Sequence, residues 1–311
     1  MDKFDIKIIK EIEKNGRITS SQLGKIISRS QQFVDYRIDL MKKRKPWPVI
    51  TPQIILNPYK SGLRSFLLFV KLEKIDNNKK FFDKVKNFNC VNWIIQSGYD
   101  FDFIIMLTSE NVGSLYEDIT KLFKADKIYD FDLREITKHQ MLSHEYLTNN
   151  KLILENNVIT QPEKIDDFDK KILTLLIKNG KEKLVTIGTK LGINYKTVQT
   201  HIKKMMANGV ITGYRPFINP GVFDYNSFFV RFTTNITADY ELTKFLKFLS
   251  ENNNITDSFE FLGRFSNAII IRAKKETEIN LILDKIRLEV PKLQDVKVYP
   301  IFDDSLFKSV I

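Results

Sequence analysis

Two stretches of the chain carry the same pattern of residues at a constant offset of 164 positions. The segment DKFDIKIIKEIEKNG, at Asp2–Gly16, aligns with DDFDKKILTLLIKNG, at Asp166–Gly180. The register continues as far as Met41 and Met205, and a three-residue insertion at 46–48 shifts it afterwards. Agreement at many spaced positions is the signature of an internal duplication. We therefore expect two units of about 150 residues each.

Each unit opens with stretches in which apolar residues recur at helical spacing. The third stretch follows the second after a short turn, which is the arrangement of a helix-turn-helix. The alternating segment VITGYRPFI, at 210–218, comes next and predicts the strand of a wing. The expected helices are 4–14, 19–27 and 31–43 in the first unit, and 169–178, 184–191 and 195–207 in the second.

The remainder of each unit reads as strand, helix, strand, strand, helix and strand, and 128–136 is expected to close the first sheet. The predicted fold class is α+β, with two repeats, each a winged helix-turn-helix domain followed by a ferredoxin-like βαββαβ domain. The expected boundaries are 1–58 and 165–220 for the winged domains, 59–147 and 221–311 for the ferredoxin-like domains, and 148–164 for a polar linker.

Composition excludes several classes of protein. The chain has no run of 18 apolar residues, so no membrane span is expected. No membrane is predicted among its partners. Its first residues are acidic and helical in period, unlike a signal peptide, and a cytoplasmic location is expected. The single cysteine, Cys90, excludes a disulfide framework. Three histidines are too few to suggest a metal cluster, so neither a metal nor another cofactor is predicted.

Positive charge is concentrated where the helix-turn-helix patterns lie. The whole chain carries a formal charge of +11. Residues 1–50 hold 12 Lys and Arg against 6 Asp and Glu, and residues 165–215 hold 10 against 4, so each block has a charge of +6. A basic balance suits nucleic acid or an anionic membrane surface and does not by itself choose between them.

Several motifs resemble those of the Lrp/AsnC family of transcription regulators. They are D-x-x-I-L-x-x-L-x-x-N-G at Asp169–Gly180, GVITGYRPFINP at Gly209–Pro220 and NGR at Asn15–Arg17, and the order of the domains agrees twice over. The chain looks like a tandem fusion of two such units. The resemblance implies a regulator that binds double-stranded DNA, responds to a small effector such as an amino acid, and self-associates through its ferredoxin-like domains, without catalytic residues.

The helix expected at 195–207 carries the stronger candidate DNA contacts. Val198, Ile202 and Met205 form its apolar stripe, and donors and positive charges form the opposite stripe. Lysines suit phosphates, whereas glutamine and threonine suit base edges. A solvated helix face is the alternative. The candidate residues are Asn194, which we expect to cap the helix, and Tyr195, Lys196, Thr197, Gln199, Thr200, Lys203 and Lys204.

The matching helix of the first unit is the weaker reader. Asp35 and Asp39 stand where the second unit has Gln199 and Lys203, and each carboxylate would repel phosphate. Three roles remain open for this helix: base reading, anchoring to the DNA backbone, and contact with another protein. Because the two reading helices differ, an asymmetric DNA site is expected. Its candidate contacts are Ser30, Gln31, Gln32 and Arg37, and Trp47 could stack on a nucleotide or cover the core.

The family resemblance implies effector binding at the hairpin in each ferredoxin-like domain. The first copy, SGYDFDF, keeps two carboxylates that could hold an α-amino group, whereas the second, LGRFSNA, has Ser266 and Asn267 instead. The second copy is therefore a poor amino-acid site. The candidate effector residues are Gly98, Tyr99, Asp100 and Asp102 in the first copy and Gly263 and Arg264 in the second.

Two alternatives to a DNA-binding regulator stay open. Some tandem proteins of this architecture resemble sirohaem decarboxylases, and a tetrapyrrole site of that kind could draw on His139, His144, Arg134 and Arg264. The scarcity of histidine and the basic reading helix argue against it. The other alternative is a regulatory partner that has lost DNA binding and acts through its paired sheets.

Overall fold

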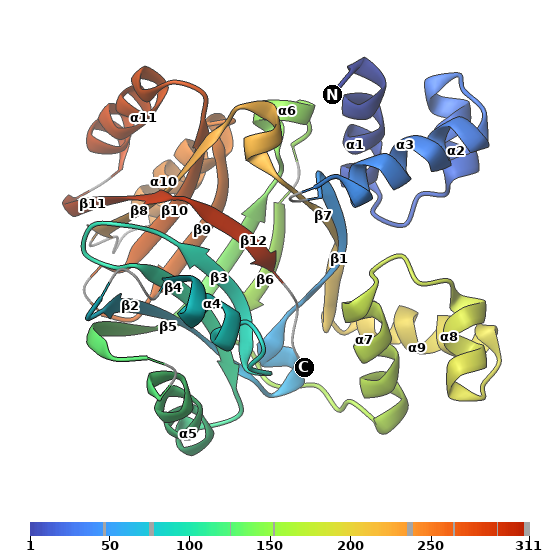
Figure 1. Cartoon of the computed structure of the whole chain (residues 1–311), viewed down its shortest axis with the longest axis horizontal. Coiled ribbons are helices and arrows are strands. Elements are labelled where there is room, and N and C mark those ends of the chain that lie inside the picture. Colours follow the sequence, from blue (N-terminus) through green and yellow to red (C-terminus); the bar gives the residue numbers. More distant parts are fainter. Residues whose placement is uncertain are drawn as a thin grey trace.

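The computed structural model places the two winged units side by side, on one flank of a large sheet with helices (Figure 1). Pro46, Trp47 and Arg264 lie outside the described residues, so neither the role expected for Trp47 nor that of Arg264 is addressed by the structure. The structure describes residues 1–45, 48–74, 78–124, 126–151, 153–234, 239–263, 265–290 and 292–307.

The predicted helix-turn-helix elements are confirmed in both units. Side-chain oxygens of Asp2 and Asp166 cap the first helix of each unit with the same reciprocal capping box. Isoleucine, leucine and valine on the inner faces of the helices form a separate core for each winged unit. The helices are α1 (Lys3–Lys14), α2 (Ser20–Ile27) and α3 (Gln31–Lys43), then α7 (Asp167–Lys178), α8 (Leu184–Leu191) and α9 (Tyr195–Ala207).

The strands expected to form local wings pair with each other instead. β1 (Ile50–Leu56) runs antiparallel to β7 (Ile211–Ile218), with Ile50 opposite Ile218. Ile218 packs in the core of the first winged unit, and Ile54 packs in the core of the second. A lone strand after each third helix leaves its backbone groups unpaired unless another strand satisfies them. The other unit supplies that strand, so each winged unit completes the core of its neighbour.

The ferredoxin-like order of elements is confirmed in both units. A short 3-10 turn, Pro58–Ser61 (η1) or Pro220–Phe223 (η3), leads from the winged unit into the sheet. The first unit has β2 (Arg64–Leu72), α4 (Asn78–Val85), β3 (Val91–Gln96), β4 (Phe103–Ser109), α5 (Val112–Phe123) and β5 (Ile128–Leu142). The second has β8 (Asn226–Thr234), α10 (Asp239–Glu251), β9 (Ile255–Phe261), β10 (Asn267–Ala273), α11 (Glu276–Glu289), β11 (Leu293–Ile301) and β12 (Asp303–Phe307).

The last strand of each ferredoxin-like unit crosses into the sheet of the other. β5 is longer than the predicted 128–136, because its first half pairs with β2 and its second half pairs with β9. In the same way β11 pairs with β8, and β12 continues from it to pair with β3. The strand order is therefore β11-β8-β10-β9-β5-β2-β4-β3-β12, a single sheet built from both units.

A shared apolar core lies where the first-unit and second-unit strands of this sheet face each other. Phe69 of β2, Phe229 of β8 and Phe259 of β9 belong to one buried cluster, with ring centroids of neighbouring pairs 5.8 and 5.9 Å apart. The opposite sheet faces form separate cores beneath the helices of each unit. The chain thus buries against itself the surfaces that two separate subunits could have used to pair.

The segment 148–164, expected to be a linker, contains ordered secondary structure. A short helix, α6 (Glu145–Thr148), precedes it, and β6 (Ile153–Val158) pairs with the second half of β5. Further along, the Glu163 carboxylate forms an ion pair with Lys60, with Nζ and Oε1 2.9 Å apart. The extension of β5 beyond its own sheet exposes a strand edge, and β6 covers it.

Candidate nucleic-acid interface

Helix α9 presents the polar stripe that its sequence predicts. Val198, Ile202 and Met205 are buried in the core of the second winged unit. Oδ1 of Asn194 accepts a hydrogen bond from the amide of Lys196 at 2.9 Å, so Asn194 caps the helix as expected. The exposed residues on the other side of α9 are Tyr195, Lys196, Thr197, Gln199, Thr200, Lys203 and Lys204.

Two of these exposed residues are partly engaged within the protein. The Thr200 hydroxyl donates to the carbonyl oxygen of Lys196 at 3.0 Å, which leaves its lone pairs as acceptors. Nζ of Lys204 lies 3.8 Å from Oδ2 of Asp169. The central part of the candidate face therefore consists of Lys196, Gln199 and Lys203. The two lysines suit phosphate contacts, and the glutamine suits a base edge.

The outer face of α3 differs in chemistry. Asp39 forms an ion pair with Lys43 at 2.8 Å, and Oδ2 of Asp35 lies 3.5 Å from Nε2 of Gln31. Two apolar side chains are also prominent, since Tyr36 is 62% exposed and Leu40 47% exposed. Gln32 is exposed, and Ser30 caps the helix by accepting from the amide of Phe33. This face is acidic and partly apolar, unlike the basic face of α9.

Arg37 does not lie on the outer face of α3, where we expected it to contact DNA. Its Nε donates to Oδ1 of Asp5 at 2.7 Å, and its NH2 lies 2.5 Å from Oδ2 of Asp5 and 2.8 Å from Oδ2 of Asp2. Asp5 is almost fully buried. Arg37 therefore ties α3 to the start of α1 and is not available to phosphate in this arrangement.

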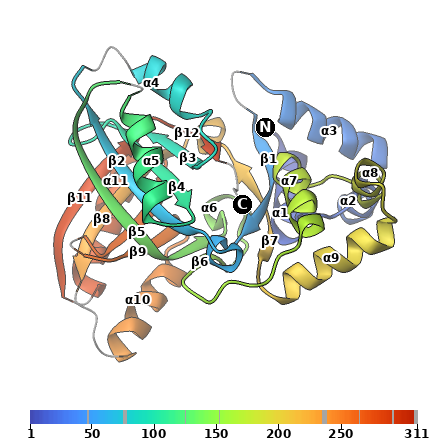
Figure 2. The same ribbon diagram turned by 90° about the horizontal axis from the view of Figure 1, so that it is seen from below.

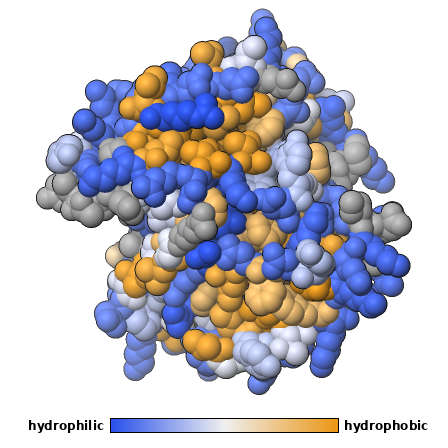
Figure 3. Space-filling view, turned by 90° about the vertical axis from the view of Figure 1, so that its left-hand side faces the viewer, coloured by the Kyte–Doolittle hydropathy of each residue, from blue (hydrophilic) through white to orange (hydrophobic). Residues whose placement is uncertain are grey.

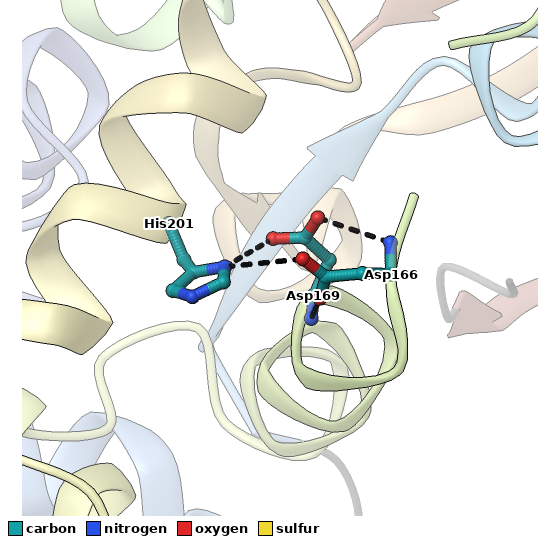
Figure 4. A group of neighbouring side chains, drawn as sticks. All are labelled: Asp166, Asp169 and His201. Atoms are coloured by element: carbon teal, nitrogen blue, oxygen red, sulfur yellow. Dashed lines mark hydrogen bonds and ion pairs between the residues drawn. The ribbon is translucent and has the colours of Figure 1, made fainter. Parts of the chain in front are cut away.

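His201 of α9 occupies the position equivalent to Arg37, and Figure 4 shows it facing two carboxylates. Nδ1 of His201 lies 2.7 Å from Oδ1 of the buried Asp169 and 4.0 Å from Oδ2 of Asp166. Ligand atoms of the three residues lie within 4.8 Å of one another, so they could hold a metal ion. The number of histidines in the sequence gave no sign of this group. Two of its three possible ligands are carboxylates of the capping box that begins α7. The guanidinium of Arg37 at the same place in the first unit favours an ion pair.

The predicted effector hairpin of the first unit packs against the second unit. Nζ of Lys297, in β11, lies 2.7 Å from Oδ2 of Asp100, and this hydrogen bond lowers the pKa of the Asp100 carboxyl. Asp102 is buried, and it accepts from the amide of Leu72 and from Nζ of Lys71, at 2.8 and 3.1 Å. Both carboxylates that we expected to bind an effector are thus already engaged by cations of the chain.

The glycine of each hairpin lies against the last strand of the other unit. A Cβ atom at Gly263 would lie 2.7 Å from NH1 of Arg134, and φ at Gly263 is +97°, so only glycine fits here without strain. A Cβ atom at Gly98 would lie 3.0 Å from the ring of Phe302. Tyr99, next to Gly98, is 76% exposed. The hairpins therefore serve the joining of the two units.

The two histidines that a tetrapyrrole site would need are buried and paired with carboxylates. Nε2 of His139 lies 3.1 Å from Oδ1 of Asp257, and Nδ1 of His144 lies 2.7 Å from Oε1 of Glu13. Burial lowers the pKa of both imidazoles, which favours their neutral form. Arg134, the remaining described candidate, pairs with Asp132 at 2.8 Å.

The space beside His144 is small. A cavity of about 20 Å³ there is bounded by Arg215, Asp257 and Arg272 among others. That volume suits a single water molecule, which needs roughly 10–15 Å³ of such space. Within the part of the chain that the structure describes, these residues therefore leave no room for a tetrapyrrole.

Known DNA-binding proteins are similar in sequence to both winged units of this chain. The winged helix-turn-helix DNA-binding family model matches residues 1–44 and 165–212. The HTH-type transcriptional regulator FL11 of Pyrococcus furiosus is 30% identical over 122 residues, which are 39% of this chain and 80% of the relative. The leucine-responsive regulatory protein of Haemophilus influenzae is 23% identical over 141 residues, 45% of this chain and 85% of the relative.

A solved structure covers both units at once. The siroheme decarboxylase NirDL matches 99% of this chain and 94% of its own, with a TM-score of 0.62 and 14% sequence identity. A likeness at this identity shows a common fold, and folds are shared among unrelated functions. None of the helices in the described part of the chain is long and apolar enough to cross a membrane.

The two winged helix-turn-helix units, each followed by a ferredoxin-like unit, place the chain among proteins that carry winged helix-turn-helix DNA-binding domains, here as a tandem repeat. The proteins similar in sequence show to which family of regulators the chain belongs. This chain belongs to the Lrp/AsnC family of transcription regulators, and it carries two units of that family in one polypeptide.

Proposed function

We propose that this chain is a sequence-specific, DNA-binding transcription regulator that acts as a covalent pseudo-dimer. The observation that carries the proposal is the exposed face of α9, on which Lys196, Gln199 and Lys203 stand opposite the buried stripe. Pairing of β1 with β7 holds a second winged unit beside it. Joining the partners in one chain raises their effective concentration, so pairing needs no second copy.

We infer that the two reading helices serve two half-sites, and they differ in chemistry. In the view of Figure 2, α3 and α9 lie on opposite sides of the pair of winged units, with the other helices of both units between them. A symmetric dimer of such units reads a palindrome. Here the basic face of α9 and the acidic face of α3 favour an asymmetric site, in which α9 makes the base contacts and α3 contributes less or contacts a protein.

Binding of selected duplexes by matched variants tests this asymmetry. The second-unit variant is Lys196→Ala/Lys203→Ala, and the first-unit variant is Gln32→Ala/Tyr36→Ala. Lys170→Ala/Lys178→Ala, on exposed positions of α7, serves as a charge-matched control. We expect roughly tenfold or greater loss of affinity for the α9 variant only, with a salt slope lowered by about 1 for each phosphate that is no longer neutralised. Equal losses for the α9 and α3 variants would refute the asymmetry, and no duplex binding by the wild type would refute the function.

We also propose two features from the family. An amino-acid effector at the first hairpin would have to displace Lys297 from Asp100, so its binding would disturb the contact between units.

Self-association of whole chains would use the outer faces of the ferredoxin-like units. On the side where Figure 1 places α11 and α5, Figure 3 shows two separate hydrophobic patches. Exposed apolar residues of these elements include Leu281 and Leu288, and Tyr116.

The decarboxylase alternative has a direct spectroscopic test. Fold likeness alone does not transfer an activity, and His139 and His144 are buried beside carboxylates. Titration of the purified protein with an iron uroporphyrin, followed in the Soret region, should leave the spectrum of the porphyrin unchanged. A saturable shift that is lost in His144→Ala would favour the enzymatic function over the one proposed.

A further inference from the structure

A cavity lies between the two winged units. Its volume is about 450 Å³. One wall is the turn that leads into α2 together with the side of α3 that carries Gln31, Asp35 and Lys42, and the other wall holds Lys181 and Lys183 from the turn before α8. Among the described residues that line it, none belongs to α9, so this cavity is distinct from the α9 face proposed to make the base contacts.

Cations outnumber carboxylates around this cavity. Arg17, Lys42, Lys181 and Lys183 line it, and Asp35 is the carboxylate among the described residues that do so. Arg17 is held by backbone, since its guanidinium donates to the carbonyl oxygens of Gly180 and Glu182 at 3.1 and 2.9 Å. The Glu182 carboxylate pairs with Lys190, at 3.6 Å. The positive charge of the cavity is therefore only partly balanced by the protein.

Burial and the nearby positive charges lower the pKa of the Lys181 amine. Its Nζ lies 3.5 Å from the carbonyl oxygen of Ile18 in the first unit. Burial, together with the charges of Lys42 and Arg17, lowers the pKa of Lys181 to about 8. An anion in the cavity would reverse this effect, because a negative charge nearby stabilises the protonated amine.

The duplication gives an internal comparison. At the constant offset of 164, Ser20, Ser21 and Lys42 correspond to Leu184, Val185 and Met206. These two serine hydroxyls and this lysine are thus replaced by apolar side chains in the second unit. This polarity is a specific property of one side of the molecule and does not follow from the fold that the two units share.

We propose that this cavity binds a phosphate group, held by Lys42, Lys181 and Lys183 and by the hydroxyls of Ser20 and Ser21. Lysine ammonium groups and hydroxyls are common ligands of phosphate oxygens. The phosphate could belong to the DNA backbone between the two half-sites, and that source rests on the proposed function. It could equally belong to a small phosphorylated solute, which does not depend on DNA binding.

Calorimetric titration with two probes tests the proposal. The probes are inorganic pyrophosphate and a selected duplex, and the proteins are the wild type, Lys181→Ala/Lys183→Ala and the control Lys170→Ala/Lys178→Ala. We expect the cavity variant to bind pyrophosphate roughly tenfold more weakly or worse, and the control to bind like the wild type. Wild-type affinity should also fall as the pH rises through about 8, because Lys181 loses its proton there. Lys181→Arg should bind without this dependence, since arginine stays charged.

The duplex identifies the source of the phosphate. If the DNA backbone is the occupant, the cavity variant binds the duplex more weakly as well, and its salt slope falls by about 1 for each phosphate that it no longer binds. If the occupant is a small solute, duplex binding is unchanged and only pyrophosphate binding falls. Wild-type and cavity-variant proteins that behave alike towards both probes, or equal losses in the control, would overturn the proposal. Failure of the wild type to bind any duplex counts against the proposed function, and pyrophosphate still decides this inference.

Discussion

Oε1 of Glu13 lies 2.7 Å from Nδ1 of His144, which joins the first winged unit to the end of β5. The same carboxylate accepts from the backbone amide of His144 at 2.6 Å, from the Thr148 hydroxyl, and from Nδ2 of Asn150 at 3.0 Å. Burial alone would raise the pKa of Glu13, but these hydrogen bonds outweigh it and bring the pKa to about 2. The equivalent residue of the second unit is Ile177, so this anchor belongs to the first unit alone.

Removal of the Glu13 carboxylate should destabilise the protein. Glu13→Ala leaves the buried donors on His144, Thr148 and Asn150 without their acceptor, and we expect a loss of about 3 kcal/mol or more in the free energy of unfolding. Glu11→Ala, whose carboxylate pairs with Lys14 near the surface of the same helix, should change it by less than about 1 kcal/mol. Chemical denaturation measures both, and similar values for the two variants would contradict the role of the anchor.

The buried histidines should make the protein less stable in mild acid. The pKa values of His139 and His144 are lowered in the folded protein, chiefly by burial. The unfolded chain therefore binds protons first, near pH 6.5, and stability that is fully present above that pH falls as the pH decreases below it. The slope is at most about 1.4 kcal/mol per pH unit for each histidine.

Denaturant unfolding between pH 7.5 and 5 checks this direction. His139→Asn should flatten the dependence, because it removes one of the two groups that take up a proton on unfolding. Glu13, whose pKa is also lowered, adds a further loss only at lower pH, between about 4.3 and 2. Stability that rose on acidification from pH 7 to 5 would mean that the buried imidazoles are charged.

Arginine should replace His201 with little loss of stability. Arg37 pairs with Asp5 in the first unit as His201 pairs with Asp169 in the second. We expect His201→Arg to keep the unfolding free energy within about 1 kcal/mol, and His201→Ala to lower it by about 1–3 kcal/mol, because Asp169 is buried and would lose its main partner. Melting temperatures with EDTA and with added Zn²⁺ complete the test. A zinc-dependent rise that His201→Arg abolishes would assign these residues to a metal instead.

The helices could be predicted from the sequence, whereas the contacts between units could not. Periodicity of Val198, Ile202 and Met205 defines the buried face of α9 locally, so its exposed face follows directly. β1 and β7 pair although they lie about 160 residues apart in the chain. The sequence of neither strand shows which other strand it pairs with. The ion pairs of Arg37 could not be predicted for the same reason, since the capping box that binds it lies 32 residues away in the chain.

Two glycines should be essential where each winged unit meets the strand of the other. A Cβ atom at Gly16 would lie 2.5 Å from Cβ of Tyr214 in β7, and one at Gly180 would lie 2.9 Å from the backbone of Gln53 in β1. Alanine at either position must push the strand away, so we expect a loss of about 1–3 kcal/mol for each variant. Gly221→Ala, where the nearest atom would be 3.4 Å away, is the control. Unchanged unfolding of Gly16→Ala and Gly180→Ala would show that the units do not pack this closely.

Grafting the charge pattern of α9 onto α3 should strengthen DNA binding. Asp35→Gln/Asp39→Lys gives α3 the residues found at Gln199 and Lys203, removes two carboxylates that would repel phosphate, and adds a cation. We expect roughly tenfold tighter binding and a steeper salt slope by about 1. Asp284→Gln/Glu251→Lys, with exposed acidic residues on α11 and α10, makes the same change in net charge on the ferredoxin-like unit. If both variants gain equally, the effect is one of overall charge. If neither gains, α3 does not face DNA, and its exposed Tyr36 and Leu40 are left for contact with a protein.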